Sequence, residues 1–318
     1  MNRQIMRELQ PLSICLLFLL LSTLTVNGSA SLASDLDTSD KVHKAINEIK
    51  AKVDSYHQSL VSGNESQVWH LAILLGKPGV GKTTLFNLLA GKNIVVKKNG
   101  RNFVLHAVNP VEGSCIGHGL NSATFAPVFW HDPVSKIVFC DFAGMPDTRT
   151  NYDIVHAYIL DYVCQKFSNV VLILTIAEAC FSVRNQRGES VREDIAHISE
   201  FFTIETISAA AKAVSLIIAD GPSNPAEIKT DFEAILQEHG QALERERPRA
   251  LRLLTQLINA PITCTPSVRP GTLIDSPYLD NTTSEAVRRS IVEGVLRSTP
   301  LAGEIKLRAS IGENSQRD

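Results

Sequence analysis

The sequence predicts an α/β protein of three layers, with a mostly parallel β-sheet between two layers of flanking helices. Short apolar runs alternate with segments of helical periodicity across residues 67–270, as expected when crossover helices join parallel strands. Two runs, Val170–Ile176 and Val214–Ile218, are apolar throughout, which is typical of strands buried on both faces. At 318 residues, 44% of them hydrophobic, the chain is long enough to bury one large core of this kind.

At the N-terminus, residues 1–33 are predicted to be a signal peptide or a signal anchor. Arg3 and Arg7 precede an apolar run, Leu12–Val26, and small residues follow it, with cleavage expected after Ala30 or Ala33. The run is shorter than the roughly 20 residues that an untilted helix needs to cross a bilayer. Because the basic residues precede the run, either form sends the rest of the chain into the secretory pathway or holds it at a membrane.

The next segment, residues 34–66, is predicted to be a linker followed by an amphipathic helix. Its first part is small and acidic, and Ser39 or Asp40 can cap a helix that runs to about Val61. Apolar residues follow one another in steps of four and three: Val42, Ile46, Ile49, Val53, Tyr56 and Leu60. Such a stripe suits a helix lying on the main domain or a helix that pairs with a second copy of the chain.

The alternating segments that follow are each assigned to one element. Strands are predicted at His70–Leu75, Asn102–Ala107, Ala123–Trp130, Lys136–Phe142, Val170–Ile176, Val214–Ala219 and Ile262–Cys264. Helices are predicted at Thr83–Ala90, Asp153–Phe167, Ser190–Phe202, Thr206–Ala213, Ala226–His239, Ala242–Asn259 and Ser284–Leu296. Because the chain becomes more polar after Pro270, residues 271–318 are expected to form a helical and flexible C-terminal extension.

A glycine-rich loop lies between the first predicted strand of the sheet and the helix after it. It has the form G-x-x-x-x-G-K-T, and its residues are Gly76, Lys77, Pro78, Gly79, Val80, Gly81, Lys82, Thr83 and Thr84. Glycines let the backbone aim N–H groups at phosphate oxygens, and the helix start adds partial positive charge. Lys82 is expected to reach the β- and γ-phosphates, and the Thr83 hydroxyl to ligate Mg²⁺. The loop therefore predicts binding of a nucleoside triphosphate, GTP or ATP, with Mg²⁺.

A second half of this site is predicted at the end of the strand Lys136–Phe142. Asp141 ends an apolar strand, where an acid can hold Mg²⁺ through a water, and Gly144 can offer its backbone N–H to the γ-phosphate. Between the two motifs, Thr124 is a candidate for a further Mg²⁺ ligand, with Ser122 second. The alternative for Thr124 is a β-branched residue that simply begins a strand.

Together these motifs resemble those of the translation-factor-related class of GTPases, most strongly the branch of immunity-associated (AIG1-type), septin and dynamin-like G domains. The resemblance rests on G-K-P-G-V-G-K-T at residues 76–83, the region of Ser122 and Thr124, and D-F-A-G-M-P-D-T at residues 141–148, and it covers roughly Trp69 to Pro270. It implies slow intrinsic hydrolysis, a nucleotide-dependent homodimer and membrane association. In this branch an apolar residue, here Met145, stands where other GTPases carry a glutamine, so no catalytic residue is assigned.

One motif of that class is missing. The resemblance calls for N/T-K-x-D after the fifth core strand, where the acid reads guanine, but Val214–Ala219 is followed by Asp220-Gly221-Pro222-Ser223-Asn224. This segment has no lysine, and its acid stands at a different offset. Three functions therefore stay open: a GTPase acting as a switch or assembly module at a membrane, an ATPase or nucleotide kinase, and a pseudo-GTPase working through protein contacts.

The composition argues against nucleic acid as a partner but does not identify the cellular compartment of the domain. The net charge of −2 gives no basic bias for nucleic-acid binding. Apart from Cys15 in the apolar run, five cysteines remain, an odd number without zinc-site spacing, so neither a disulfide scaffold nor a zinc site is expected. Export would carry a triphosphate-binding domain to a compartment poor in triphosphates, so the side of the membrane on which it acts is not determined.

Overall fold

The computed structural model describes residues 32–62, 68–99, 102–114, 116–117, 126–144, 150–181, 188–200, 202–203, 206–219, 224–266 and 274–301. The predicted signal segment lies outside these residues except for its last two positions. By internal contacts the chain divides into two compact units, Met1–Ala51 and Lys52–Asp318. Among the described residues, no helix combines the length and the apolar character needed to cross a bilayer.

The secondary structure alternates between strands and helices over the second unit. The described strands are β1 (His70–Leu75), β2 (Asn93–Asn99), β3 (Asn102–Val108), β4 (Val128–Asp132), β5 (Ile137–Asp141), β6 (Asn169–Ala177), β7 (Val214–Ala219) and β8 (Ile262–Cys264). The described helices are α2 (Leu32–Val61), α3 (Lys82–Leu89), α4 (Thr150–Lys166), α5 (Glu189–Glu200), α6 (Ile207–Lys212), α7 (Pro225–Glu246), α8 (Pro248–Leu257) and α9 (Asn281–Arg297), with the 3₁₀ helix η1 (Glu178–Phe181).

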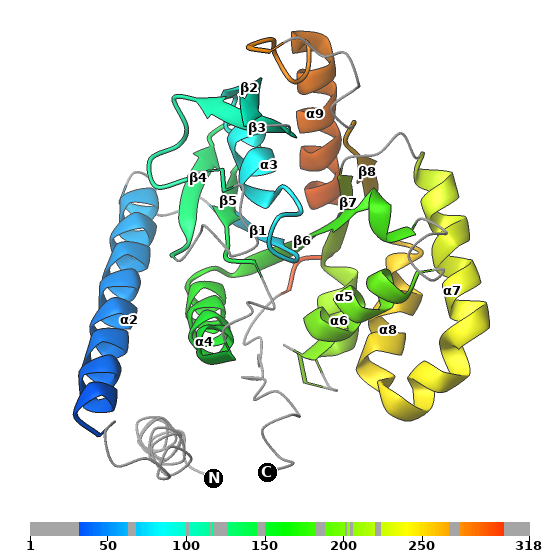
Figure 1. The fold of residues 1–318 in the computed structure, drawn as a ribbon, viewed down its shortest axis with the longest axis horizontal. Helices are drawn as coiled ribbons and strands as arrows, with labels where there is room; N and C mark the ends of the chain where they lie inside the picture. Colours follow the sequence, from blue (N-terminus) through cyan, green and yellow to red (C-terminus); the bar gives the residue numbers. More distant parts are fainter. Residues whose placement is uncertain are drawn as a thin grey trace. The chain divides into compact units, whose positions relative to one another are not determined.

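The main sheet has six strands in the order β4-β5-β1-β6-β7-β8. All neighbouring pairs are parallel except β4 and β5, which are antiparallel. In Figure 1, α3 and α9 lie on one side of this sheet, whereas α4, α5, α6 and α8 lie on the other. The predicted three-layer fold with a mostly parallel sheet is therefore confirmed.

The order of the strands reverses its direction at β1. From β1 the chain passes through α3 to β5 on one side, whereas β6, on the other side of β1, leads onward to β7. In open α/β sheets, ligands bind outside the carboxyl ends of the strands at such a reversal. The glycine-rich loop begins here, directly after Leu75.

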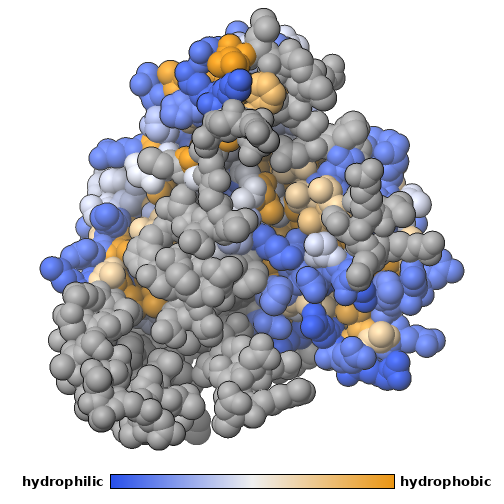
Figure 2. Space-filling view, viewed as in Figure 1, coloured by the Kyte–Doolittle hydropathy of each residue, from blue (hydrophilic) through white to orange (hydrophobic). Residues whose placement is uncertain are grey.

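Capping residues explain where two of the helices begin. Asn224 precedes α7, and its Oδ1 accepts hydrogen bonds from the N–H groups of Ala226 and Glu227, at 2.9 and 3.0 Å. Asp280 precedes α9 and accepts from Thr283 N at 2.8 Å. Such caps satisfy N–H groups that a helix start leaves without an intrahelical partner. Over α7 and α8 the surface drawn in Figure 2 is mainly hydrophilic.

The hairpin of β2 and β3 was only half predicted, because β2 was missed. The two strands pair from Asn93 with Val108 to Asn99 with Asn102. The run Val95-Val96-Lys97-Lys98 carries charge and so hides its strand character, although the dipeptide Asn99-Gly100 is a known hairpin signal. The chain after residue 274 extends this small sheet, since Tyr278 N donates to Ile94 O at 2.7 Å.

On the C-terminal side, one predicted helix boundary was wrong, and one helix packs more closely on the sheet than expected. The break between the helices around residue 240 falls instead at Arg247, because Pro248 supplies no N–H for the helix to continue, while Gly240 lies within α7. The helix α9, expected within a C-terminal extension, belongs to the core: Ile291 is fully buried. A Cβ on Gly294 would lie 2.7 Å from Ser215 Oγ, so α9 packs closely on β7.

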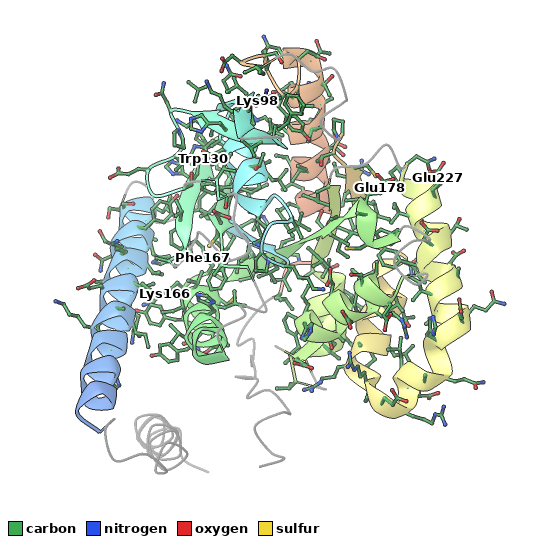
Figure 3. The ribbon with its side chains drawn as sticks, in the orientation of Figure 1. Lys98, Trp130, Lys166, Phe167, Glu178 and Glu227 are labelled. Atoms are coloured by element: carbon green, nitrogen blue, oxygen red, sulfur yellow. The ribbon has the colours of Figure 1, made fainter. Side chains whose placement is uncertain are left out.

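The helix α2 begins at Leu32, so the stretch up to Asp40 that composition predicts as a linker is helical. Its last part, within the second unit, contacts β4 and α4. The Tyr56 ring stacks on Phe129 with centroids 4.9 Å apart. Asp54 accepts from the Tyr162 hydroxyl at 2.8 Å and pairs with Lys166 at 2.6 Å, the lysine labelled on α4 in Figure 3. At Tyr56 the apolar stripe therefore lies on the chain's own domain.

Asp54→Ala should loosen the end of α2 from α4. The substitution removes the acceptor for Tyr162 and the partner of Lys166, whose pKa is raised mainly by the hydrogen bond that its ammonium donates to Asp54. We expect the free energy of unfolding to fall by about 1 kcal/mol and amide exchange in residues 52–61 to accelerate. Glu293→Ala, which breaks an exposed pair with Arg297 inside α9, is the control and should leave that exchange unchanged. Equal protection in both variants would contradict the assigned role of Asp54.

Candidate nucleotide-binding site

The glycines of the loop take backbone conformations that other residues rarely adopt. The φ angles of Gly76, Gly79 and Gly81 are 146°, 82° and 90°. At Gly76 a Cβ would lie 2.4 Å from the carbonyl oxygen of Thr175, so the loop presses against the end of β6. The curl that the sequence motif predicts is therefore present, and β6 supports it from one side.

Gly144 brings the second predicted motif against this loop. A Cβ on Gly144 would lie 2.6 Å from the backbone nitrogen of Pro78. Only a residue without a side chain allows such an approach, and contact of this kind requires the chain after β5 to pass directly beside the loop. The two motifs predicted from separate parts of the sequence thus form one site.

The helix after the loop is arranged to receive an anion. Gly81 is the N-cap residue of α3, and no side chain caps this helix start. The first turn of a helix carries partial positive charge from N–H groups without intrahelical partners. Lys82, Thr83 and Thr84 form that turn, so the predicted phosphate site coincides with the positive end of α3.

Lys82 is buried, and its ammonium group lies inside the curl of the loop. Its Nζ donates to the carbonyl oxygens of Gly76 at 2.9 Å and of Lys77 at 2.8 Å. Burial lowers the pKa of Lys82 to about 8, although the nearby Asp141 carboxylate works against this shift. A positive group held among backbone dipoles, with little water around it, is suited to bind phosphate oxygens.

Two of the three predicted Mg²⁺ ligands, Thr83 and Asp141, meet in the structure. Asp141 is the last residue of β5, in register with Leu74 of β1, and it is fully buried. Thr83 Oγ1 donates to Asp141 Oδ2 at 2.9 Å. Mg²⁺ prefers oxygen ligands and is commonly held by one or two such groups together with substrate phosphates, so these residues fit the ion. Thr124, the third predicted ligand, lies outside the described residues.

Lys77 has a role that the sequence did not reveal. Its ammonium forms an ion pair with Asp194 of α5, whose side chain is only 4% exposed. Burial raises the pKa of Asp194, and the hydrogen bond from Lys77 opposes this shift. The Lys77 side chain therefore anchors the loop to α5. Nothing local in the sequence links a loop lysine to one particular acid of a later helix.

Two glutamates and a cysteine lie near one another at the carboxyl ends of β6, β7 and β8. Glu178 follows β6, Glu227 lies in the first turn of α7, and Cys264 ends β8; Figure 3 labels the two glutamates. Burial, together with the nearby carboxylates of Glu178 and Glu227, raises the pKa of the Cys264 thiol to about 11. Asp220, the acid that follows β7, lies outside the described residues, as do Met145 and Ser122.

Comparison with known proteins adds little to this geometry. No protein-family model matches the sequence, and no curated protein matches it either. Among solved structures the chain is similar to the cytosolic domain of FeoB from L. pneumophila, with 13% identity and a TM-score of 0.32, over 78% of this chain and 71% of that one. A mutant NFeoB of S. thermophilus bound to GDP matches with 13% identity and a TM-score of 0.17, over 73% of this chain and 92% of that one. Scores this low assign no family, and the P-loop nucleotide-binding fold rests on the loop, the strand order and Asp141.

Proposed function

We propose that this protein binds a nucleoside triphosphate with Mg²⁺ and hydrolyses it slowly, as a GTPase that acts as a switch or assembly module at a membrane. The observation that carries the proposal is the convergence of Lys82, Thr83, Asp141 and Gly144 on one curled loop. The choice of GTP rests on the resemblance of the loop and of D-F-A-G to G-domain motifs. An ATPase or nucleotide kinase, or a pseudo-GTPase, is the alternative.

Each residue has a part in binding. The N–H groups of the loop and of the first turn of α3 hold phosphate oxygens, and Lys82 exchanges its carbonyl partners for them. Thr83 and Asp141 hold Mg²⁺, which when bound neutralises charge on the phosphates. Gly144 stands beside Pro78 and can offer its N–H to the terminal phosphate. A bound terminal phosphate would therefore contact both the loop and the chain at Gly144.

The switch would act through the chain after Gly144 and the chain before β4. In nucleotide switches, a γ-phosphate with Mg²⁺ orders segments that are released after hydrolysis. Because Met145 stands in the place of a catalytic glutamine, we expect slow intrinsic hydrolysis that depends on a partner surface. A second copy of the chain is the partner that the resemblance implies.

Titration of the purified protein with fluorescent GTP and ATP analogues, with Mg²⁺ and with EDTA, tests the proposal. We expect binding that needs Mg²⁺ and prefers GTP, with turnover that increases with protein concentration. Preference for ATP would favour an ATPase or kinase. Tight binding of GTP without turnover at high protein concentration would favour a pseudo-GTPase, and absence of triphosphate binding would overturn the assignment of the site.

We also propose that residues 1–33 direct the chain to the secretory pathway or anchor it in a membrane. Arg3 and Arg7 before the apolar run support this reading. N-terminal sequencing of the mature protein, together with carbonate extraction of membranes, separates the two forms. A new N-terminus after Ala30 or Ala33 would identify a signal peptide, whereas an intact N-terminus in the membrane pellet would identify an anchor.

Asp141→Asn should weaken Mg²⁺ binding selectively. The substitution keeps an acceptor for the Thr83 hydroxyl but removes the charge that attracts the ion. We expect the Mg²⁺ concentration for half-maximal triphosphate binding to rise about tenfold or more, with diphosphate affinity in EDTA unchanged. Asp275→Asn, which alters a surface acid paired with Lys97, is the matched control. An unaltered Mg²⁺ requirement would show that Asp141 is not a ligand.

Affinity for phosphate should also depend on the protonation of Lys82. Below its pKa of about 8 the free protein carries the ammonium that phosphate requires. Above pH 8 binding must take up a proton, so the affinity should fall by up to about tenfold per pH unit. The free energy of unfolding should rise as pH increases from 8 to 10.5, the ordinary pKa of lysine. Over this range Lys82 binds more protons in the unfolded chain than in the folded one. Calorimetry in buffers of different ionisation enthalpy would detect the proton uptake, and its absence would contradict the prediction.

A further inference from the structure

Asn87 is a fully buried polar residue in the middle of α3 that the phosphate-binding motif does not explain. Asparagine is an unfavourable choice inside a helix, and an amide is costly to bury unless it is hydrogen bonded. Its side chain faces away from solvent and makes hydrogen bonds in two directions. One direction leads back to the start of α3, and the other leads to a separate part of the chain.

In the first direction, Asn87 contacts the residue that is placed to hold Mg²⁺. The Nδ2 of Asn87 donates to the carbonyl oxygen of Thr83 at 2.9 Å. The hydroxyl of the same threonine donates to Asp141. Asn87 is thus hydrogen bonded to the backbone of a proposed metal ligand.

In the second direction, Asn87 holds the turn from Val111 to Ser114. Its Oδ1 accepts from Val111 N at 2.9 Å, and its Nδ2 lies 2.9 Å from Ser114 Oγ. Ser114 is also buried, and its hydroxyl bonds to Val111 O at 2.9 Å. The chain that follows Ser114 contains the predicted ligand Thr124. The turn is therefore the point from which that part of the chain departs.

These contacts match the chemistry of an amide. Its NH₂ group supplies the two donors that reach Thr83 and Ser114, and its oxygen supplies the acceptor for Val111 N. Aspartate keeps the acceptor but loses both donors, and leucine loses both functions while keeping a similar size. If Asn87 served only to fill the core beside Phe86 and Leu88, an apolar residue would serve as well.

We propose that Asn87 is a positioning residue that couples the Mg²⁺ ligand Thr83 to the turn 111–114. This inference rests on the proposed function. By tying both segments to one amide, Asn87 sets the backbone of Thr83 relative to the turn 111–114. These hydrogen bonds of Asn87 contribute to nucleotide binding when Mg²⁺ and the terminal phosphate are both present. A diphosphate without Mg²⁺ uses the loop and Lys82 and does not need it.

Asn87→Asp and Ser114→Ala test this role in the full chain. The probes are a fluorescently labelled GTP analogue that resists hydrolysis, used with Mg²⁺, and fluorescently labelled GDP, used in EDTA. We expect Asn87→Asp to weaken Mg²⁺–triphosphate binding about tenfold and Ser114→Ala about threefold, with GDP affinity in EDTA within about twofold of the wild type. Because they share one hydrogen-bond network, the two substitutions should combine less than additively.

Ser199→Ala provides the control for loss of a buried hydroxyl. Ser199 is buried in α5 and donates to Ala196 O at 2.7 Å, and α5 lies on the side of the sheet opposite to α3 (Figure 1). We expect it to change thermal stability only. Equal weakening of both nucleotide forms by Ser114→Ala, or an unchanged Mg²⁺ requirement in both test variants, would overturn the coupling role. Asn87→Asp can fail to fold, and Ser114→Ala then decides. Failure of the wild type to bind the triphosphate would instead overturn the proposed function.

Discussion

Lys82→Ala is expected to abolish nucleotide binding, with a loss of affinity of at least about a hundredfold. The ammonium lies inside the loop, bonded to the carbonyl oxygens of Gly76 and Lys77, where phosphate oxygens can replace those partners. Hydrogen bonds to charged groups contribute about 1.5–3 kcal/mol each, and two of them correspond to a factor of about a hundred or more. Removal also leaves the phosphate charge without its nearest counter-charge.

Lys77→Ala is the matched control because it removes a lysine from the same loop. The Lys77 ammonium is paired with Asp194, so its loss should lower thermal stability while affinity changes by less than about tenfold. Equilibrium titration below the melting temperature of each variant, with circular dichroism to confirm folding, separates the two effects. Affinity retained in Lys82→Ala would mean that phosphate binds elsewhere.

Gly76→Ala is expected to cost both stability and binding. Its φ of 146° is strained for any other residue, and the new Cβ would meet the Thr175 carbonyl at 2.4 Å. Because Thr175 belongs to β6, a central strand, the loop has to move instead of the strand. Backbone strain and overpacking contribute about 1–3 kcal/mol each, so we expect a total of about 2–6 kcal/mol.

Gly79→Ala separates backbone strain from steric overlap. Its φ of 82° is also unfavourable for alanine, but a Cβ there has no atom within 4 Å. We expect a loss of about 1 kcal/mol and retention of most triphosphate affinity. Chemical denaturation of both variants gives the comparison. Similar losses of stability in the two would show that β6 does not constrain Gly76.

The binding loop could be found from the sequence because every part of its signal is local. Strand β1 is an apolar run that ends where a glycine must turn the backbone, and Lys82 opens a helix. Asp141 was found in the same way, at the end of an apolar strand. Strand β2 escaped because its lysines face solvent, and the end of α7 was misplaced because Gly240 suggested a break that Pro248 makes instead.

From the sequence alone one could determine the α/β class, the phosphate-binding loop and the acid opposite it, because periodicity and backbone requirements act over a few neighbouring residues. The folded structure was needed to find that Gly144 lies on Pro78, that Lys77 pairs with Asp194, and that Asn87 holds the turn before Cys115. These contacts join parts of the chain brought together by the strand order. No local pattern records such pairing, since it depends on how the helices and strands pack.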